Sequence, residues 1–466
     1  MAMGKRRRRR QESIWVETAR IARGPGHPFY RRLNQILDRE GFDGFVEQSS
    51  ASFYAETLGR PSLPPAVYFR LLLIGYFEGI ESERGIAWRV ADSLTLREFL
   101  GYRLTDPTPD HSTISRNRRL IDEETHQEVF TWVLKVVAKA GLLRGKTLGV
   151  DATTLEANAA LRSIVRRDTG ESYQEFLTGL ARASGIETPT REDLAKLDKK
   201  RPGKGSNDDW ENPHDPDARI TKMKDGRTHL AHKAEHAVDL ETGAVVAVTI
   251  QGADRGDTES LGETVEEAKD QLADVLEDDE AAEQMSATVL AELVADKGCH
   301  SNAVLTEYQS QGIRTYISEP KRGRRRWRGK AEAREAVYGN RRRIRGDRGK
   351  ALLRRRGERN ERSFAHCYDT GGMRRTYLRG HRNIRKRALL HVAAFNLGLV
   401  LRHQLGFGTP RGFQGRLGRL VALLSGLWRR LNALRDAWRA AALARVHPRP
   451  FLCRAAMGFH LTSAAA

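Results

Sequence analysis

The chain has 466 residues, a formal net charge of +20 and a sequence pI of about 10.1. This length is sufficient for roughly two or three domains with a sizeable hydrophobic core. A positive charge of this size favours a polyanionic partner, for which DNA or RNA is the leading candidate. A membrane surface and a basic protein without such a partner are the alternatives, but the clustering of the arginines favours nucleic acid.

Cysteines and targeting signals indicate an intracellular protein. The three cysteines, Cys299, Cys367 and Cys453, are an odd number without framework spacing, which predicts a reducing compartment. Residues 1–26 are basic, are expected to form a disordered arm, and lack the apolar core of a signal peptide. The most apolar later run, residues 388–401, is too short to cross a bilayer. We therefore expect a cytoplasmic protein without a membrane partner.

Residues 27–140 have helical periodicity and predict an all-α N-terminal domain. Pro64 and Pro65 open a helix that is apolar nearly all round and is therefore expected to be buried. A later helix is expected after Pro109, with Asp110 or Ser112 as its cap. Short helices that end in a Ser-, Thr-, Asn- and Arg-rich one favour a helix-turn-helix-like DNA-binding module over a solvated bundle. The expected DNA-contact residues are Ser112, Thr113, Ser115, Arg116, Asn117 and Arg119.

From residue 141 the pattern changes to strands alternating with helices. A strand is predicted at 147–157, a hairpin at 229–253, a helix at 257–277, a strand at 290–298, a helix at 302–312 and a strand at 314–319. This order predicts an α/β domain at 141–405, with a mixed sheet flanked by helices and closed by an apolar helix at 385–403.

Three further segments have a distinct composition. Residues 158–228 are polar and too long for an ordinary loop, so they are either an added subdomain or a mobile arm. The arginines of residues 321–360 are too dense for a core, and Trp327 among them offers a stacking surface for a base. Residues 406–466 predict a basic amphipathic C-terminal tail, for which packing or a subunit contact is favoured over membrane association.

Three acidic residues are candidates for chemistry. Asp151 and Asp296 are each predicted to end an apolar strand, and Glu361 heads a helix-like segment among arginines. Cleavage of a phosphodiester is served by two divalent ions roughly 3.5–4 Å apart, and Mg²⁺ or Mn²⁺ prefers carboxylate oxygens. The combination therefore suggests a metal-dependent enzyme that acts on nucleic acid. A cap or surface role is the alternative for each acid, and Glu358 is the alternative third acid.

The order of elements around these acids resembles the RNase H-like core of DDE transposases encoded by bacterial insertion sequences. The specific part is ERSFAHCYDTGGMRRTYLRGHRNIRKRALLHVAAFNLGLVLR at 361–402, which is similar to the segment around that family's catalytic glutamate. The helical region from His27 resembles the family's N-terminal domain, so the resemblance covers residues 27–405. It implies that Asp151, Asp296 and Glu361 are the catalytic, metal-binding triad. It further implies DNA-backbone contacts by Arg374, Arg375, Arg379, Arg382 and Lys386.

The resemblance implies a DNA transposase that binds insertion-sequence ends and catalyses strand cleavage and strand transfer. It implies Mg²⁺ or Mn²⁺ as cofactor, as two ions, and double-stranded DNA as partner in a bacterial, nucleoid-associated protein. Because two ends must be held together, we expect a homodimer or a higher multimer. The alternatives are a catalytically inactive, transposase-derived DNA-binding regulator and another RNase H-like nuclease.

Overall fold

The computed structural model describes residues 27–55, 62–201, 205–223, 225–321, 323, 325–413, 423–435 and 438. The arm predicted at residues 1–26 lies outside these ranges. The described residues from 27 to 413 belong to one compact unit, and those from 423 onward belong to a second. Of the tail predicted at 406–466, residues 423–435 are helical, and residues 414–422, 436–437 and 439–466 lie outside the described ranges. Among the described residues, no helix combines the length and the apolarity needed to cross a membrane.

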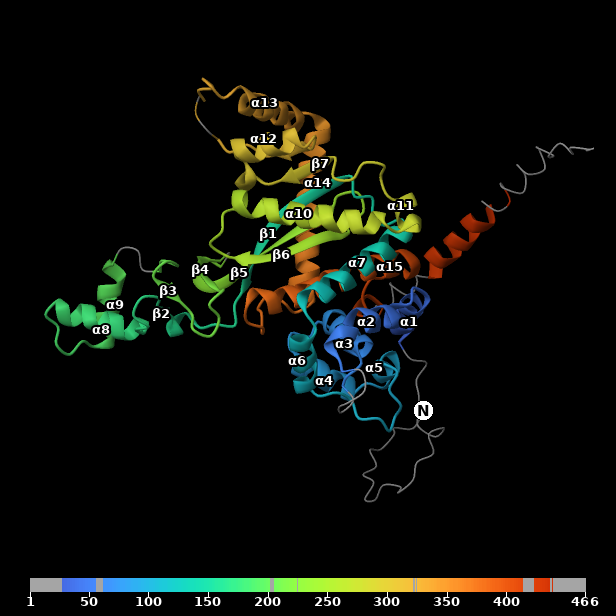
Figure 1. The fold of residues 1–466 in the computed structure, drawn as a ribbon, viewed down its shortest axis with the longest axis horizontal. Coiled ribbons are helices and arrows are strands. Elements are labelled where there is room, and N and C mark those ends of the chain that lie inside the picture. Colours follow the sequence, from blue (N-terminus) through green and yellow to red (C-terminus); the bar gives the residue numbers. More distant parts are fainter. Residues whose placement is uncertain are drawn as a thin grey trace, which may run out of the picture. The chain divides into compact units, whose positions relative to one another are not determined.

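The N-terminal region is helical, as its periodicity predicts (Figure 1). The α-helix α3 is buried nearly all round because its apolar residues leave no polar face. The α-helix α6 is capped by Asp110, whose side chain accepts a hydrogen bond from the Thr113 amide. The elements are α1 (Pro28–Arg39), α2 (Phe42–Ser50), η2 (Ala51–Phe53), α3 (Pro65–Glu78), α4 (Glu83–Ala91), α5 (Leu94–Phe99), α6 (His111–Leu120) and α7 (Glu123–Lys139).

The predicted mixed sheet is confirmed. Its strands are β1 (Thr147–Glu156), β4 (Arg219–Lys222), β5 (Thr228–Asp239), β6 (Val245–Gly252), β7 (Glu292–Ala295) and β8 (Arg314–Ile317). They lie in the order β4-β5-β1-β7-β8, and β6 also pairs with β5. The central strand β1 is antiparallel to β5 and parallel to β7, and β7 is parallel to β8. On one side of β1 lies the antiparallel hairpin of β5 and β6, and on the other side lie the parallel strands β7 and β8.

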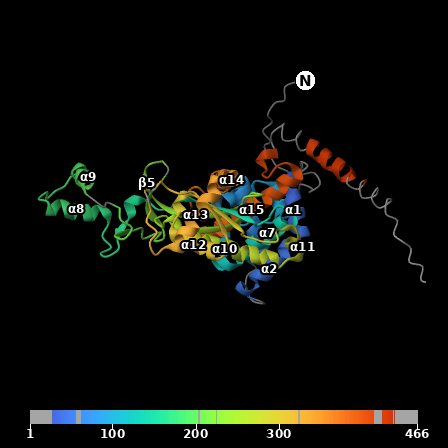
Figure 2. The ribbon, with the colours of Figure 1, turned by 90° about the horizontal axis from the view of Figure 1, so that it is seen from above.

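Helices cover both faces of this sheet (Figure 2). One face packs on α10 (Asp257–Leu276), and the opposite face is crossed by α14 (Asp347–Phe364). Gly149 of β1 permits this crossing, since a Cβ atom there would lie 3.1 Å from Cγ of Arg356 in α14. The remaining elements are α11 (Asp279–Gln284), η4 (Lys297–Cys299), α12 (Asn302–Ser310), α13 (Ala331–Arg345), the π-helical η5 (Ala365–Thr370), α15 (His381–Leu405) and η6 (Arg411–Phe413).

On each of the outer strands β6 and β8, one asparagine side chain hydrogen-bonds to both the backbone amide and the carbonyl of a single residue. Asn396 of α15 donates from Nδ2 to the carbonyl of Val245 at 2.8 Å and accepts from its amide at 2.9 Å. Asn340 of α13 makes the same pair of bonds to Ile317, at 2.8 and 2.9 Å. Each amide therefore replaces the partner that a further strand would supply, which protects the strand from pairing with another chain.

The insertion at 158–228 has short elements of its own, which form a subdomain within the larger compact unit. It contains η3 (Leu161–Ser163), β2 (Val165–Arg166), α8 (Tyr173–Ala183), α9 (Arg191–Lys200), β3 (Trp210–Glu211) and β4. A small hydrophobic cluster around the buried Trp210 holds it together, separately from the main core. Its strand β4 joins the main sheet at β5, which anchors the subdomain there.

The N-terminal helices and the sheet share one hydrophobic core. The α-helices α7 and α15 pack against each other, and α15 also packs on β6 and α3. The boundary predicted between residues 140 and 141 therefore marks a change of secondary structure inside one compact unit and not a division between two bodies.

Candidate functional site

The strand predicted at 147–157 is confirmed as β1, but Asp151 lies in its middle and not at the end of an apolar strand, as was predicted. The strand continues to Glu156 because residues 152–156 remain paired with β5. Thr153 and Thr154 suit this extension, since β-branched residues are favoured in strands. Asp151 is opposite His236 of β5 in this register. The backbone of β1 is paired with β5 both before and after Asp151, and this pairing fixes the position of the carboxylate.

Asp296 directly follows β7 and precedes η4, as predicted. The parallel register pairs Gly149 with Val294. Gly149–Val294 is the last pair, and continuing the register by two residues would bring Asp151 level with Asp296. Because alternate residues of a strand share a face, the two aspartates lie on the same face of the sheet as Gly149. This is the face that α14 crosses.

Arg356 of α14 connects the two carboxylates. Its Nη1 atom lies 2.7 Å from Oδ2 of Asp151, and its Nη2 atom lies 3.8 Å from Oδ1 of Asp296. Burial raises the pKa of Asp151, and the charge of Arg356 acts in the opposite direction. The aspartates therefore converge on one cationic group. Paired carboxylates of this kind also fit Mg²⁺ or Mn²⁺, which prefer oxygen ligands.

Glu361 lies in the last turn of α14 and is exposed. The prediction that it heads a helix is wrong, because α14 begins at Asp347 in the arginine-rich segment. Glu358 forms an ion pair with Arg362 at 3.0 Å on the same helix. Among the described residues, no group of three or more His, Cys, Asp or Glu side chains is placed to hold a metal ion. The structure thus joins Asp151 and Asp296 through Arg356 without adding Glu361 to them.

A buried polar network holds α14 on the sheet. Asn360 donates from Nδ2 to the carbonyls of Gly149 and His236, at 3.2 and 3.1 Å. Ser363 donates to the Asn360 carbonyl, so the 2.9 Å contact between His236 Nδ1 and Ser363 Oγ is a bond that His236 donates. Its Nε2 then accepts from the Tyr368 hydroxyl at 2.6 Å. Burial lowers the pKa of His236 to about 3, which keeps the ring neutral.

Sequence reasoning missed Arg356, His236 and Asn360. Arg356 and Asn360 lie four residues apart, which is the spacing of one helix face. That spacing could have indicated that the two residues lie on the same face of a helix. It does not show which of the many nearby arginines faces the sheet.

The segment after η5 pairs with the end of β1. The Glu156 amide donates to the Arg374 carbonyl at 3.0 Å, and the Thr376 amide donates to the Glu156 carbonyl at 2.8 Å. Arg374 contacts Asp369 at 2.7 Å and donates to Thr153 Oγ1 at 3.0 Å. Thr153 lies two positions from Asp151 on the same face of β1. The Arg374 side chain therefore contacts β1 two positions from Asp151.

The predicted DNA-contact residues differ in their exposure to solvent. Those that are exposed are Arg116, Arg119, Arg375, Arg379 and Arg382, and those that are partly exposed are Ser112, Thr113, Ser115 and Arg374. Asn117 and Lys386 are buried, so the prediction that they contact DNA is not supported. Asn117 accepts from the Tyr54 hydroxyl at 2.9 Å. Lys386 donates to the Arg118 and Ile121 carbonyls at the end of α6, at 3.0 and 2.7 Å.

Two family models match the chain. One, described as Transposase domain (DUF772), matches residues 18–120. The other, described as Transposase DDE domain, matches residues 200–397 and so includes Asp296 and Glu361 but begins after Asp151. A DDE domain implies an RNase H-like core, in agreement with the mixed sheet. Comparison with curated proteins and with solved structures gives no match.

Proposed function

We propose that the chain, which belongs to the insertion-sequence DDE transposases, binds the ends of its element, cleaves DNA there and transfers the freed 3′-hydroxyl to target DNA. The observation that carries this proposal is the convergence of Asp151 and Asp296 on one cationic group. Arg374 of the segment after η5 contacts Thr153, two positions from Asp151, and its charge favours a phosphate-rich substrate there.

DDE transposases generally use divalent metal ions. We propose that Asp151 and Asp296 hold Mg²⁺ or Mn²⁺, and that Glu361 of α14 completes the set. When bound, two such ions would activate the attacking hydroxyl group and stabilise charge on the leaving oxygen. In the structure Arg356 pairs with Asp151 at 2.7 Å and reaches Asp296 at 3.8 Å, so its single charge is shared between the two aspartates. It must therefore release them, or share them, when a metal ion is bound.

The protein's own contribution to the reaction is positioning. The paired strand β1 fixes Asp151, and the network of Asn360 and His236 fixes α14 over it. Arg374 is tied to β1 through Thr153 and would place a DNA phosphate near the carboxylates. The exposed arginines Arg375, Arg379 and Arg382, together with those of α6, would contact the backbone of double-stranded DNA. Two ends would be held by a homodimer or a higher multimer.

A catalytically inactive DNA-binding regulator is the second candidate. Arg356 pairs with both aspartates, and no third acid joins them among the residues that the structure describes. A permanent arrangement of this kind would bind DNA without cleaving it.

Cleavage of a labelled duplex that carries the ends of the element separates these two functions. Wild type, Asp151→Asn and the exposed control Asp279→Asn are compared with Mg²⁺ or Mn²⁺. The transposase proposal expects cleavage by wild type and the control, and binding without cleavage by Asp151→Asn. Cleavage by all three would show that Asp151 is not catalytic. Binding without cleavage by all three would favour the regulator.

A further inference from the structure

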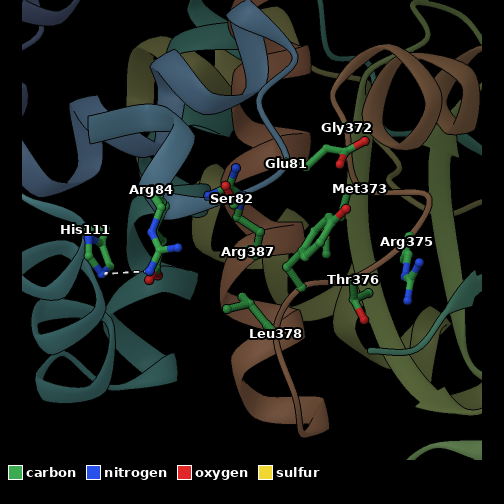
Figure 3. Close-up of a pocket in the computed structure, with 12 residues that line it drawn as sticks. Glu81, Ser82, Arg84, His111, Gly372, Met373, Arg375, Thr376, Leu378 and Arg387 are labelled. Carbon is green, nitrogen blue, oxygen red and sulfur yellow. Dashed lines mark hydrogen bonds between the residues drawn. The ribbon is translucent and has the colours of Figure 1, made fainter. Parts of the chain in front are cut away.

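A cavity of about 380 Å³ lies where the N-terminal helices meet the segment after η5 (Figure 3). Arg84 of α4 and His111 of α6 lie on one side of it, and Arg375 and Thr376 lie on the other. Tyr377, whose side chain is 46% exposed, also lines it. The walls therefore come from both regions matched by the family models, at 18–120 and 200–397.

Two of the three arginines that line this cavity, Arg84 and Arg375, are available to an anion, whereas Arg387 is buried and donates to His391 and to the Ile80 carbonyl. Within the described ranges, Arg84 has no ion pair, and its Nη2 atom lies 3.5 Å from Nε2 of His111. Arg375 lies 3.8 Å from the partly exposed Glu156, a distance at the limit of an ion pair. Of the acids that line the cavity, Glu83 is neutralised by Arg118 at 2.7 Å. Glu81 is the remaining countercharge, and it is hydrogen-bonded to the Tyr377 side chain.

Two helices also begin at this cavity. Ser82 caps α4, which starts at Glu83, and His111 is the first residue of α6. The N-terminus of a helix carries a partial positive charge and favours anions. The terminus of α6 already has the Asp110 carboxylate as its cap, so the start of α4 and the side chains of Arg84 and Arg375 are the groups that favour an anion.

The cavity is connected to the pair of aspartates by the chain itself. Arg375 lines the cavity, and its neighbour Arg374 donates to Thr153 of β1 at 3.0 Å. The side chain of Arg375 lies 3.8 Å from Glu156, which is five residues from Asp151 and so about 17 Å along the strand. A DNA strand with one phosphate at Asp151 therefore reaches this region after a few nucleotides.

We propose that this cavity binds the sugar–phosphate backbone of the DNA strand whose reacting phosphodiester lies at Asp151 and Asp296. The inference rests on the proposed function and deepens it. The N-terminal helices thereby do more than recognise duplex DNA through α6: the starts of α4 and α6 form one wall of the path that leads the strand to the carboxylates. Arg84 and Arg375 are the phosphate-contacting residues from the two walls.

The test measures the affinity of the full chain for the labelled end duplex across a series of salt concentrations, without divalent metal. Arg84→Ala and Arg375→Ala are compared with Arg89→Ala, a control on α4 that pairs with Glu78 at 3.1 Å and does not line the cavity. Each cavity variant is expected to lower the log–log salt slope by about 0.9 and to weaken binding roughly eightfold at 0.1 M salt. Wild-type slopes and affinities in both cavity variants would overturn the proposal.

A second measurement places the contact on the DNA. Ethylation of single phosphates identifies the phosphates whose modification blocks binding by wild type. In Arg84→Ala, ethylation of one of these phosphates, within a few nucleotides of the bond that is cleaved, should no longer affect binding. A lost position far from that bond would contradict a path to Asp151. If wild type does not cleave but the cavity variants still lose affinity and a phosphate contact, the transposase proposal fails and the DNA-binding cavity stands.

Discussion

The guanidinium of Arg356 is ion-paired with Asp151 at 2.7 Å and extends to Asp296 at 3.8 Å. Two carboxylates on one face of a sheet repel each other, and Arg356 offsets this repulsion from the helix above. A divalent ion at the same carboxylates competes with the arginine for them. Metal binding and the Arg356 ion pair are therefore thermodynamically linked, whatever the geometry of the metal complex.

Replacing Arg356 by alanine should make stability more dependent on metal. Without metal, we expect a loss of about 1–3 kcal/mol, because the partly buried Asp151 loses its charged partner. With Mn²⁺, the variant should gain more in melting temperature than wild type, because no side chain competes for the carboxylates. The measurement is thermal unfolding over a series of Mn²⁺ concentrations.

Arg348→Ala is the matched control for that experiment. Arg348 is also on α14 and pairs with the buried Glu292 at 2.6 Å, away from the two aspartates. Its replacement should lower stability and leave the response to Mn²⁺ as in wild type. Equal metal responses of the two variants would contradict competition between Arg356 and the ion.

Replacing each residue by glutamine distinguishes the role of Glu361 from that of Glu358. Glu361→Gln should reduce cleavage by at least about 10³-fold with DNA affinity retained, as expected for the loss of a metal ligand. Glu358→Gln should retain cleavage within a few-fold, since Glu358 pairs with Arg362 on the exposed side of α14. Single-turnover cleavage rates and binding curves for both variants decide this. The reverse ranking would assign the third acid to Glu358.

The sequence was a good guide where a pattern is local. The alternation over 229–253 predicts the hairpin that the structure forms at 228–239 and 245–252, and the apolar run before Asp296 predicts β7. The strand predicted at 147–157 is also formed, but Asp151 lies within it and not at the end of its apolar part as predicted. Polar residues after an apolar run favour a turn, but here they pair with the long strand β5 and remain extended.

Contacts between segments that are distant in the sequence could not be predicted from local sequence patterns. Lys386 looks like a DNA-contact residue among arginines, yet α15 carries it to the carbonyl end of α6, where it is buried. Arg356 is 60 positions from Asp296 and 205 from Asp151 in the numbering. Only the crossing of α14 over Gly149 brings its side chain to both aspartates. Polar groups find such partners through tertiary packing, which composition and periodicity do not specify.

The asparagines on the outer strands predict a stability effect. Asn396→Leu would leave the amide and carbonyl of Val245 without their present partner, and Asn340→Leu would do the same to Ile317. Each change should cost about 1–3 kcal/mol or more, because an unsatisfied buried polar group is expensive. Urea unfolding measures this cost. Asn158→Leu is the control, since its amide makes one exposed contact at 3.3 Å, and a cost as large as for Asn396 would contradict the role of the paired bonds.

Two buried histidines away from the aspartates predict how stability depends on pH. His391 accepts from Nε of Arg387 at 2.8 Å, so its Nδ1 carries the proton and donates to the Cys367 carbonyl at 3.1 Å. His126 has Tyr68 at one ring nitrogen and the Asp122 carbonyl at the other. Burial lowers the pKa of each to about 3, whereas an unfolded histidine has a pKa near 6.5.

Between these two values the unfolded chain binds more protons than the folded one, so stability rises with pH and is lost as pH falls from about 6.5 toward 3. Each histidine contributes about 1.4 kcal/mol per pH unit inside this window. Replacing His391 by glutamine retains a hydrogen-bond donor and an acceptor and removes the titration, so the slope between pH 6 and 4 should fall by about that amount. Urea unfolding at several pH values measures the slope, and exposed His214→Gln is the control. An unchanged slope in His391→Gln would mean that this ring becomes protonated in the folded protein at about the same pH as in the unfolded chain.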